Sequence, residues 1–108
     1  MTRPRAVVFD LDGTLVDSLP DIVWSFRAAF DATRLPVPDE AAVRALIGAP
    51  LEEMAAAFVT GETEVEGVCD AYRRIYPEHF TDRTAPFPGV PELLDELRAA
   101  GYRTAVAT

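Results

Sequence analysis

The sequence predicts an α/β protein in which two parallel strands of a doubly wound core are separated by an insertion of four helices. The first observation is an uninterrupted apolar run, Ala6–Phe9, which is typical of a buried parallel strand. The second is a helical period of apolar residues from Ser18 to about Phe80. The third is a further helix followed by a strand at residues 103–108. Because strands separated by helices pair in parallel, we expect the first two strands of such a core.

The chain divides into three segments where these patterns change. Residues 1–18 are expected to hold the first core strand and the loop after it, and residues 19–81 the helical insertion. Residues 82–108 are expected to hold a linker, a core helix and the second core strand. The stretch Thr81–Pro88 is polar and contains two prolines, so it suits a hinge between insertion and core.

The first inserted helix is predicted to begin at Ser18, where Pro20 is tolerated in a first turn and Asp21 adds favourable charge. Its inward stripe consists of Ile22, Val23, Phe26, Ala29 and Phe30. Trp24 lies off this stripe, which leaves open either a partly covered surface position or contact with a closing lid. A second helix is expected from Asp39, which serves as its cap, to Ile47, with Gly48 as its stop.

A third helix is expected over Leu51–Val59 and a fourth over about Glu64–Phe80, where Pro77 should end or bend the helix. The side chains predicted to face inward are Leu51, Met54, Ala55, Phe58, Val68, Ala71, Tyr72, Ile75 and Phe80. The only histidine, His79, has no acidic partner at a recognisable spacing, so we assign it no role. The only cysteine, Cys69, is expected to contribute packing alone.

The last helix is predicted to open with Pro91 in its first turn and to end at Gly101. The side chains expected inward are Leu93, Leu94, Leu97 and Ala100. If the strand at 103–108 lies beside Ala6–Phe9 in parallel, Thr108 comes level with Asp10. A hydroxyl at that edge could donate a hydrogen bond to a phosphate oxygen.

Asp10 and Asp12 follow the first strand directly, so both carboxylates are expected at its carboxyl end. A carboxylate can attack a phosphoryl group to form an aspartyl phosphate, and a second carboxyl group can act as acid and then as base. Hard oxygen ligands beside a phosphate favour Mg²⁺. Gly13 permits a tight turn whose amides could face a phosphate oxygen. The residues alone also allow a hairpin of Val7–Phe9 with Thr14–Val16, because Asp-Gly is a strong hairpin signal.

Residues 9–18, which read FDLDGTLVDS, resemble the first motif of the haloacid dehalogenase-like hydrolase superfamily, and Leu19–Ile22 extend it as in phosphoglycolate phosphatases. The resemblance implies a Rossmann-like core with a helical cap formed by residues 19–81. It implies that Asp10 is the nucleophile, that Asp12 is the general acid and base, and that both coordinate Mg²⁺, Asp12 through its backbone carbonyl. The phosphate-binding residues that it implies are Leu11, Gly13, Thr14 and Thr108, with Gly48 as a further candidate.

The superfamily's third and fourth motifs, a Lys and an acidic metal ligand, lie downstream of the second motif, and all ten basic residues of this chain are Arg. We therefore expect the N-terminal part of a longer enzyme that is marginally folded and poorly active by itself. The activity expected of the parent is Mg²⁺-dependent hydrolysis of small phosphate monoesters such as phosphoglycolate. A phosphosugar mutase, a pyrophosphatase and an inactive helical interaction module remain as alternatives.

Eighteen acidic and ten basic side chains give a formal net charge of −8, which disfavours nucleic acid as a partner. No apolar run has the length of a membrane span, and residues 1–9 do not resemble a secretory signal, so we expect no membrane association and a cytoplasmic location. A single cysteine agrees with a reducing compartment. The expected partner is a small phosphorylated metabolite, and the sequence does not predict the oligomeric state.

Overall fold

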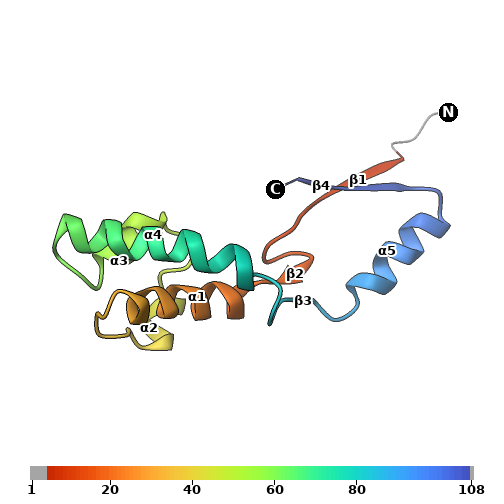
Figure 1. The fold of residues 1–108 in the computed structure, drawn as a ribbon. Helices are drawn as coiled ribbons and strands as arrows, with labels where there is room; N and C mark the ends of the chain where they lie inside the picture. The colour runs from red at the N-terminus through yellow and green to blue at the C-terminus, as the bar shows by residue number, and fades with distance from the viewer. Residues whose placement is uncertain (1–4, 108) are drawn as a thin grey trace. The chain divides into compact units, whose positions relative to one another are not determined.

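The computed structural model describes residues 5–107, and these residues form two compact units (Figure 1). The strand unit comprises the described residues up to Ser18 and those from Thr84 onward. The helical unit is Leu19–Arg83. Each unit is described by itself below.

In the strand unit, β1 (Ala6–Asp10) pairs in parallel with β4 (Arg103–Ala107), and α5 (Val90–Ala99) leads into β4. The register runs from Ala6 opposite Arg103 to Asp10 opposite Ala107. The predicted parallel pairing is therefore confirmed. The hairpin alternative is wrong, because β1 hydrogen-bonds to β4 and not to residues 14–16.

The side chains of this two-stranded sheet are less covered than the sequence suggested. Val8 is 64% exposed and Val106 is 50% exposed, and every residue of β4 is exposed. Helix α5 has no buried residue, and Leu93 is 43% exposed, so the predicted burial of the α5 stripe is wrong for the described chain. A sheet of two strands offers too little surface to bury a helix face and both of its own faces.

Two further short strands of the strand unit stand in the chain just before and just after the helical insertion. β2 (Val16–Asp17) and β3 (Ala85–Pro86) pair antiparallel, with Val16 opposite Pro86 and Asp17 opposite Ala85. The Phe87 amide extends this pairing by donating to the Leu15 carbonyl at 3.1 Å. Neither strand was predicted: β2 lies in the segment expected to be the loop after the first core strand, and β3 lies in the expected linker Thr81–Pro88.

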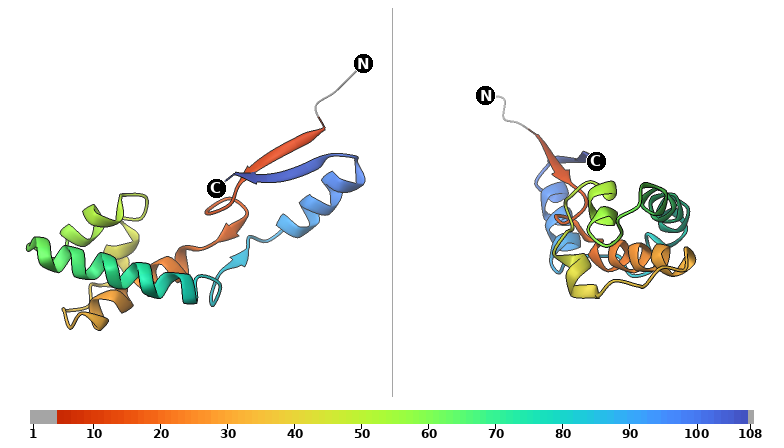
Figure 2. Two further views of the ribbon diagram at one scale, coloured as in Figure 1. Left: turned by 45° about the horizontal axis from the view of Figure 1, so that its top comes forward. Right: turned by 90° about the vertical axis from the view of Figure 1, so that its left-hand side faces the viewer.

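The helical unit contains α1 (Leu19–Ala32), α2 (Glu40–Arg44), α3 (Leu51–Ala56) and α4 (Glu62–His79), so all four inserted helices are present (Figure 2). Asp39 caps α2 as predicted, since its side chain accepts from the Ala41 amide. Among the described residues, no helix combines the length and the apolar character that crossing a membrane requires.

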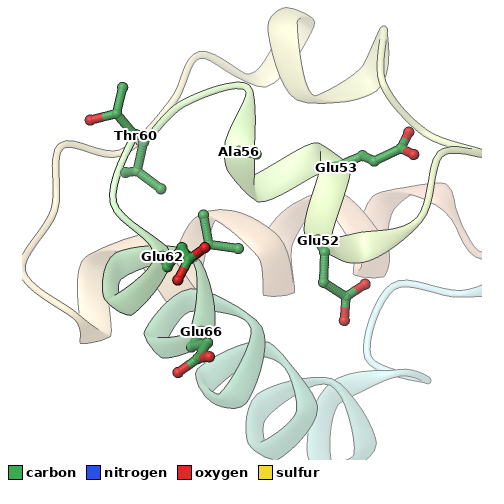
Figure 3. Close-up of a pocket in the computed structure, with 8 residues that line it drawn as sticks. Glu52, Glu53, Ala56, Thr60, Glu62 and Glu66 are labelled. Atoms are coloured by element: carbon green, nitrogen blue, oxygen red, sulfur yellow. The ribbon is translucent and has the colours of Figure 1, made fainter.

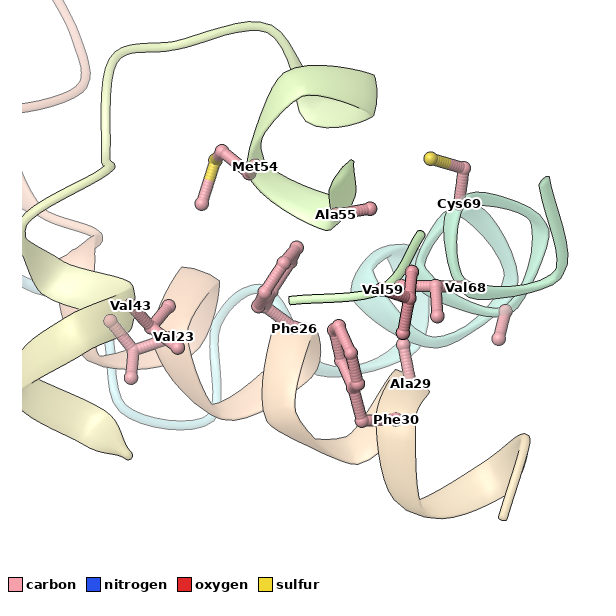
Figure 4. Packing of buried hydrophobic residues seen from close by; sticks show 11 residues of the cluster. Val23, Phe26, Ala29, Phe30, Val43, Met54, Ala55, Val59, Val68 and Cys69 are labelled. Atoms are coloured by element: carbon pink, nitrogen blue, oxygen red, sulfur yellow. The ribbon is translucent and has the colours of Figure 1, made fainter. Parts of the chain in front are cut away.

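The core of the helical unit is one apolar cluster to which every one of its helices contributes (Figure 4). Phe26 and Phe30 project from α1 into its centre, with ring centroids 5.2 Å apart. The buried members are Val23, Phe26, Ala29, Phe30, Val43, Met54, Ala55, Val59, Val68, Cys69 and Ala71. The helical period thus identified the core of α1 except at Ile22, which is half-buried and outside the cluster. On α4 it identified Val68 and Ala71 as buried, and Tyr72 and Ile75 pack against the cluster.

In the helical unit, two helix boundaries and the burial expected for Phe80 were wrong. α2 ends at Arg44, before the predicted Ile47, and α3 ends at Ala56, before the predicted Val59. Phe80 was expected inward but is 48% exposed, because it lies just beyond the last residue of α4, where its ring contacts the Tyr76 ring at 6.1 Å between centroids. Pro77 lies inside the final turn of α4, which ends two residues later at His79.

Candidate active site

Strand β1 places Asp10 at its carboxyl end, opposite Ala107 of β4. The Asp10 side chain is exposed, and its Oδ1 accepts a hydrogen bond from the Leu11 amide at 3.1 Å. This contact orients the carboxylate along the start of the next turn. Asp10 therefore stands at the edge of the sheet where parallel strands present reactive groups.

The turn after β1 is held by its own backbone. The Leu11 carbonyl accepts from the amides of Thr14, Leu15 and Val16 at 3.3, 2.9 and 3.1 Å. The Gly13 amide donates in return to the Val16 carbonyl at 3.0 Å. Gly13 has φ +78°, a left-handed conformation that other residues adopt only with strain, although an added Cβ would meet no atom within 4 Å. The buried side chain of Leu15 anchors the turn.

Asp12 lies within this turn, and its backbone forms an isolated β-bridge with that of Val16. Its side chain is exposed, as is that of Asp10, so both carboxylates are accessible to solvent and to a ligand. Carboxylate and backbone carbonyl oxygens are ligands that Mg²⁺ prefers. Within residues 5–107, however, no group of three or more Asp, Glu, His or Cys side chains converges. The residues present thus fit part of a magnesium coordination shell.

The other predicted phosphate-binding residues lie in different parts of the chain. Leu11, Gly13 and Thr14 belong to the turn, where the amides of Gly13 and Thr14 donate to backbone carbonyls. Thr108 lies outside the described residues, and its neighbour Ala107 is the residue opposite Asp10. Gly48 belongs to the helical unit.

Gly48 has φ +108° and lines an apolar pocket of about 200 Å³ in the helical unit. The other residues that line this pocket are Ile22, Phe26, Ile47, Ala49, Leu51, Met54 and Tyr72. The segment around Gly48 therefore packs against the helical core, and nothing in the pocket supplies a positive charge for phosphate.

A second depression of the helical unit lies between α3 and the start of α4 (Figure 3). Four glutamates line it, Glu52, Glu53, Glu62 and Glu66. The pKa of Glu52 lies below its ordinary value, first because a backbone N–H donates to it and then because Arg73 does. Like charges repel, so this acidic depression is unsuited to a phosphate ester.

Two polar contacts of the helical unit were missed in the sequence analysis. The prediction that His79 lacks an acidic partner is wrong, because its Nδ1 lies 2.6 Å from Oδ2 of Asp82. Asp21 was considered only as a helix-end charge, yet its side chain is fully buried and binds Arg83. The first pair joins His79, the last residue of α4, to Asp82 beyond the helix, and the second joins residues 62 positions apart. Helical periodicity therefore predicts neither contact.

The fold is that of an α/β protein with a parallel strand pair and a helical insertion between the strands. A sequence profile of haloacid dehalogenase-like hydrolases matches residues 7–108. The chain belongs to this family.

The relatives include proteins named as kinases and proteins named as phosphatases. The tyrosine-protein kinase PtkA of Mycobacterium tuberculosis is 42% identical over 105 residues, which are 97% of this chain and 36% of that protein. The phosphoglycolate phosphatase of Mesorhizobium japonicum is 33% identical over 114 residues, covering 100% of this chain and 50% of that protein.

A solved structure supports the fold. The crystal structure of a predicted phosphoglycolate phosphatase from Haemophilus somnus superposes with a TM-score of 0.78 at 32% identity, covering 100% of this chain and 52% of that one. The chain thus spans about half, or less, of the length of these relatives.

Proposed function

We propose that the protein is a Mg²⁺-dependent phosphatase of small phosphate monoesters, with phosphoglycolate as the leading candidate substrate. The observation that carries the proposal is the pair of exposed carboxylates, Asp10 and Asp12, at the carboxyl end of β1 in a family member. The relative in Mesorhizobium japonicum, named phosphoglycolate phosphatase, supports the choice of substrate. The net charge of −8 favours a small metabolite over a nucleic acid.

In the proposed reaction, an Asp10 carboxylate oxygen attacks the phosphorus atom, and the bond from phosphorus to the ester oxygen breaks. Asp12, in its protonated form, gives its proton to the leaving alkoxide. Asp12 then takes a proton from water, whose oxygen attacks phosphorus, and inorganic phosphate leaves with Asp10 regenerated. Bound Mg²⁺, held by the Asp10 carboxylate and the Asp12 backbone carbonyl, would offset the negative charge of the transferring group. The turn that contains Gly13 also carries Asp12, which lies two residues after Asp10 in the chain.

The remaining parts of the proposal concern the domains. We assign residues 1–18 to the core strand and catalytic loop, residues 19–81 to a cap, and residues 82–108 to the linker, core helix and second strand. Phosphate binding is assigned to Leu11, Gly13, Thr14 and Thr108, with Gly48 as a further candidate in the cap. The buried free thiol of Cys69 agrees with the reducing conditions of the cytoplasm.

The test is an assay of the protein encoded by the complete gene on a panel of phosphate esters, with and without Mg²⁺. We expect Mg²⁺-dependent release of inorganic phosphate that Asp10→Asn abolishes, because the amide is not a nucleophile of comparable strength. Asp95→Asn is the matched control, since Asp95 is exposed on α5 and has no assigned role. Release of phosphate by Asp10→Asn at the unmodified rate would overturn the proposal. A panel that includes hexose phosphates and pyrophosphate also distinguishes a mutase or a pyrophosphatase.

A second candidate function is phosphoryl transfer to protein tyrosine. The observation that favours it is the 42% identity to the protein named tyrosine-protein kinase PtkA. Incubation with γ-labelled ATP and a tyrosine-containing peptide distinguishes the two activities: label on the peptide supports the kinase, and label in free phosphate alone supports the phosphatase.

A further inference from the structure

The depression between α3 and the start of α4 has an apolar floor. Val59 belongs to the core cluster of the helical unit, Val65 packs against that cluster, and the exposed Ala56 lies beside them in the lining. The volume of the depression is about 770 Å³, which is the size of sites that take up ligands. Exposed apolar surface with a polar rim is typical of an interaction site. We call this depression the α3–α4 groove.

The rim of the α3–α4 groove is negatively charged (Figure 3). The glutamates that line it are all exposed, and they are Glu52 and Glu53 of α3 and Glu62 and Glu66 of α4. Arg73, outside the lining, neutralises Glu52 by an ion pair. Within the described part of the chain, no ion pair neutralises the other three carboxylates, and no basic side chain lines the groove.

Helix stability explains part of this charge but not all of it. Glu52, Glu53 and Glu62 lie in the first turns of their helices, where the helix dipole favours negative charge. Glu66 lies beyond the first turn of α4 and four residues after Glu62, and like charges at this spacing repel each other. The groove therefore carries negative charge that its own helices do not stabilise and that a positively charged ligand would neutralise.

We propose that the α3–α4 groove binds a basic amphipathic helix of a partner protein. The apolar face of such a helix would pack on the floor of the groove, as amphipathic helices do in hydrophobic grooves. Its Lys or Arg side chains would face the glutamates of the rim, and this complementarity of charge would select basic partners over acidic ones. All the residues involved belong to the helical unit, so the inference does not depend on the proposed phosphatase activity.

The test uses the protein encoded by the complete gene and a fluorescein-labelled peptide as the probe. The peptide has about 14 residues, roughly four helical turns, with Leu and Ala on one face and Lys and Arg on the other. A peptide of the same composition in scrambled order is the control, and fluorescence anisotropy measures the binding of both. We expect the amphipathic peptide to bind about tenfold more tightly or better, because only its helix gathers the apolar side chains on one face.

Two adjacent alanines provide a matched pair of variants. Ala56 lines the groove, whereas Ala57, which is also exposed, does not. Ala56→Arg should weaken binding of the amphipathic peptide by about tenfold or more, because the arginine covers the floor and repels the basic peptide. Ala57→Arg makes the same change in charge and should leave binding within about twofold of the unmodified protein.

A second pair of variants tests the charge of the rim. Glu62→Gln combined with Glu66→Gln should weaken binding by roughly three- to tenfold, the sum of two exposed charge pairs. The control is Glu78→Gln combined with Glu96→Gln, which removes two exposed carboxylates outside the groove and should leave binding unchanged. Circular dichroism verifies the helix content, and if Ala56→Arg loses it, this second pair decides the matter.

Three results would overturn the proposal. The first is equal binding of the peptide by a groove variant and its matched control, and the second is equally tight binding of the scrambled peptide. The third is no binding of the amphipathic peptide to the unmodified protein, as when another segment of the same protein covers the groove. Analytical ultracentrifugation examines a second copy as the occupant: a dimer that Ala56→Arg dissociates and Ala57→Arg does not would assign the groove to self-association and refute the partner helix.

Discussion

Gly13 determines the shape of the turn that carries Asp12, because its φ of +78° is accessible to glycine at little cost. Gly13→Ala should strain the turn by about 1–2 kcal/mol, the cost of a left-handed conformation for an L-residue. We expect lower kcat/KM for phosphate esters and an unchanged urea midpoint of the helical unit. Gly67→Ala is the control, since Gly67 lies within α4 at an ordinary φ and an added Cβ would come no nearer than 3.9 Å to Thr33. Equal kcat/KM in the two variants would contradict this account of the turn.

Cys69 provides a chemical probe of the helical core. Burial, and then the negative charge of Glu52, raises the pKa of the Cys69 thiol above its ordinary value. The neutral thiol therefore adds to the stability of the fold below the pKa that Cys69 has in the unfolded chain. This contribution is lost as the pH rises through the higher pKa of Cys69 in the folded chain. We expect Cys69 to react slowly with a disulfide reagent at pH 8 in the folded protein and fast in urea. The thiolate that the reagent releases measures both rates. Equally fast reaction without urea would show that the thiol is accessible.

The helices differ in how well the sequence predicted them, for a physical reason. α1 and α4 each bury an apolar stripe in the same cluster, so their apolar period is strong. The predicted start of α1 and both predicted ends of α4 lie within two residues of the observed ones. β2 and β3 have two residues each, which is too short for any period, and only their pairing reveals them. α5 has a clear stripe but no partner that buries it among the described residues, so its pattern predicted a helix correctly and its burial wrongly.

The aromatic residues of α1 and of the end of α4 allow a matched test of the core. Phe26 is fully buried, whereas Phe80 is 48% exposed. Phe26→Ala should reduce the free energy of unfolding of the helical unit by about 3–5 kcal/mol through lost burial and a cavity. Phe80→Ala should change it by about 0.5 kcal/mol or less, as is usual for a surface substitution. Urea unfolding followed by circular dichroism measures both, and comparable losses would show that Figure 4 misidentifies the core.

The two units of the molecule are unequally stabilised. The apolar cluster lies wholly in the helical unit, while the buried residues of the strand unit are Leu15 and Ser18. We expect amides of α1 and α4 to exchange hydrogen much more slowly than those of β1 and β4 in the 108-residue chain, because local stability follows apolar burial. Hydrogen exchange with mass spectrometry measures this. Equal protection of β1 and α1 would mean that the sheet is stable without further cover.

Only those parts of the candidate site that depend on residues close together in the sequence could be predicted. Asp10 and Asp12 are two residues apart in the chain, and the parallel direction of β1 and β4 followed from the order of strands and helices. The register did not follow: Thr108 was expected level with Asp10, whereas Asp10 lies opposite Ala107. The buried ion pair joins Asp21 to Arg83, which lies 62 positions away, and no sequence pattern predicts it. Pairings of that kind depend on the completed packing of α1 against α4, which a one-dimensional period does not contain.

A buried ion pair brings the first turn and the last residue of the helical unit together, since Asp21 binds Arg83 through both of its carboxylate oxygens. The two ends of residues 19–83 are therefore held by contacts inside that unit itself.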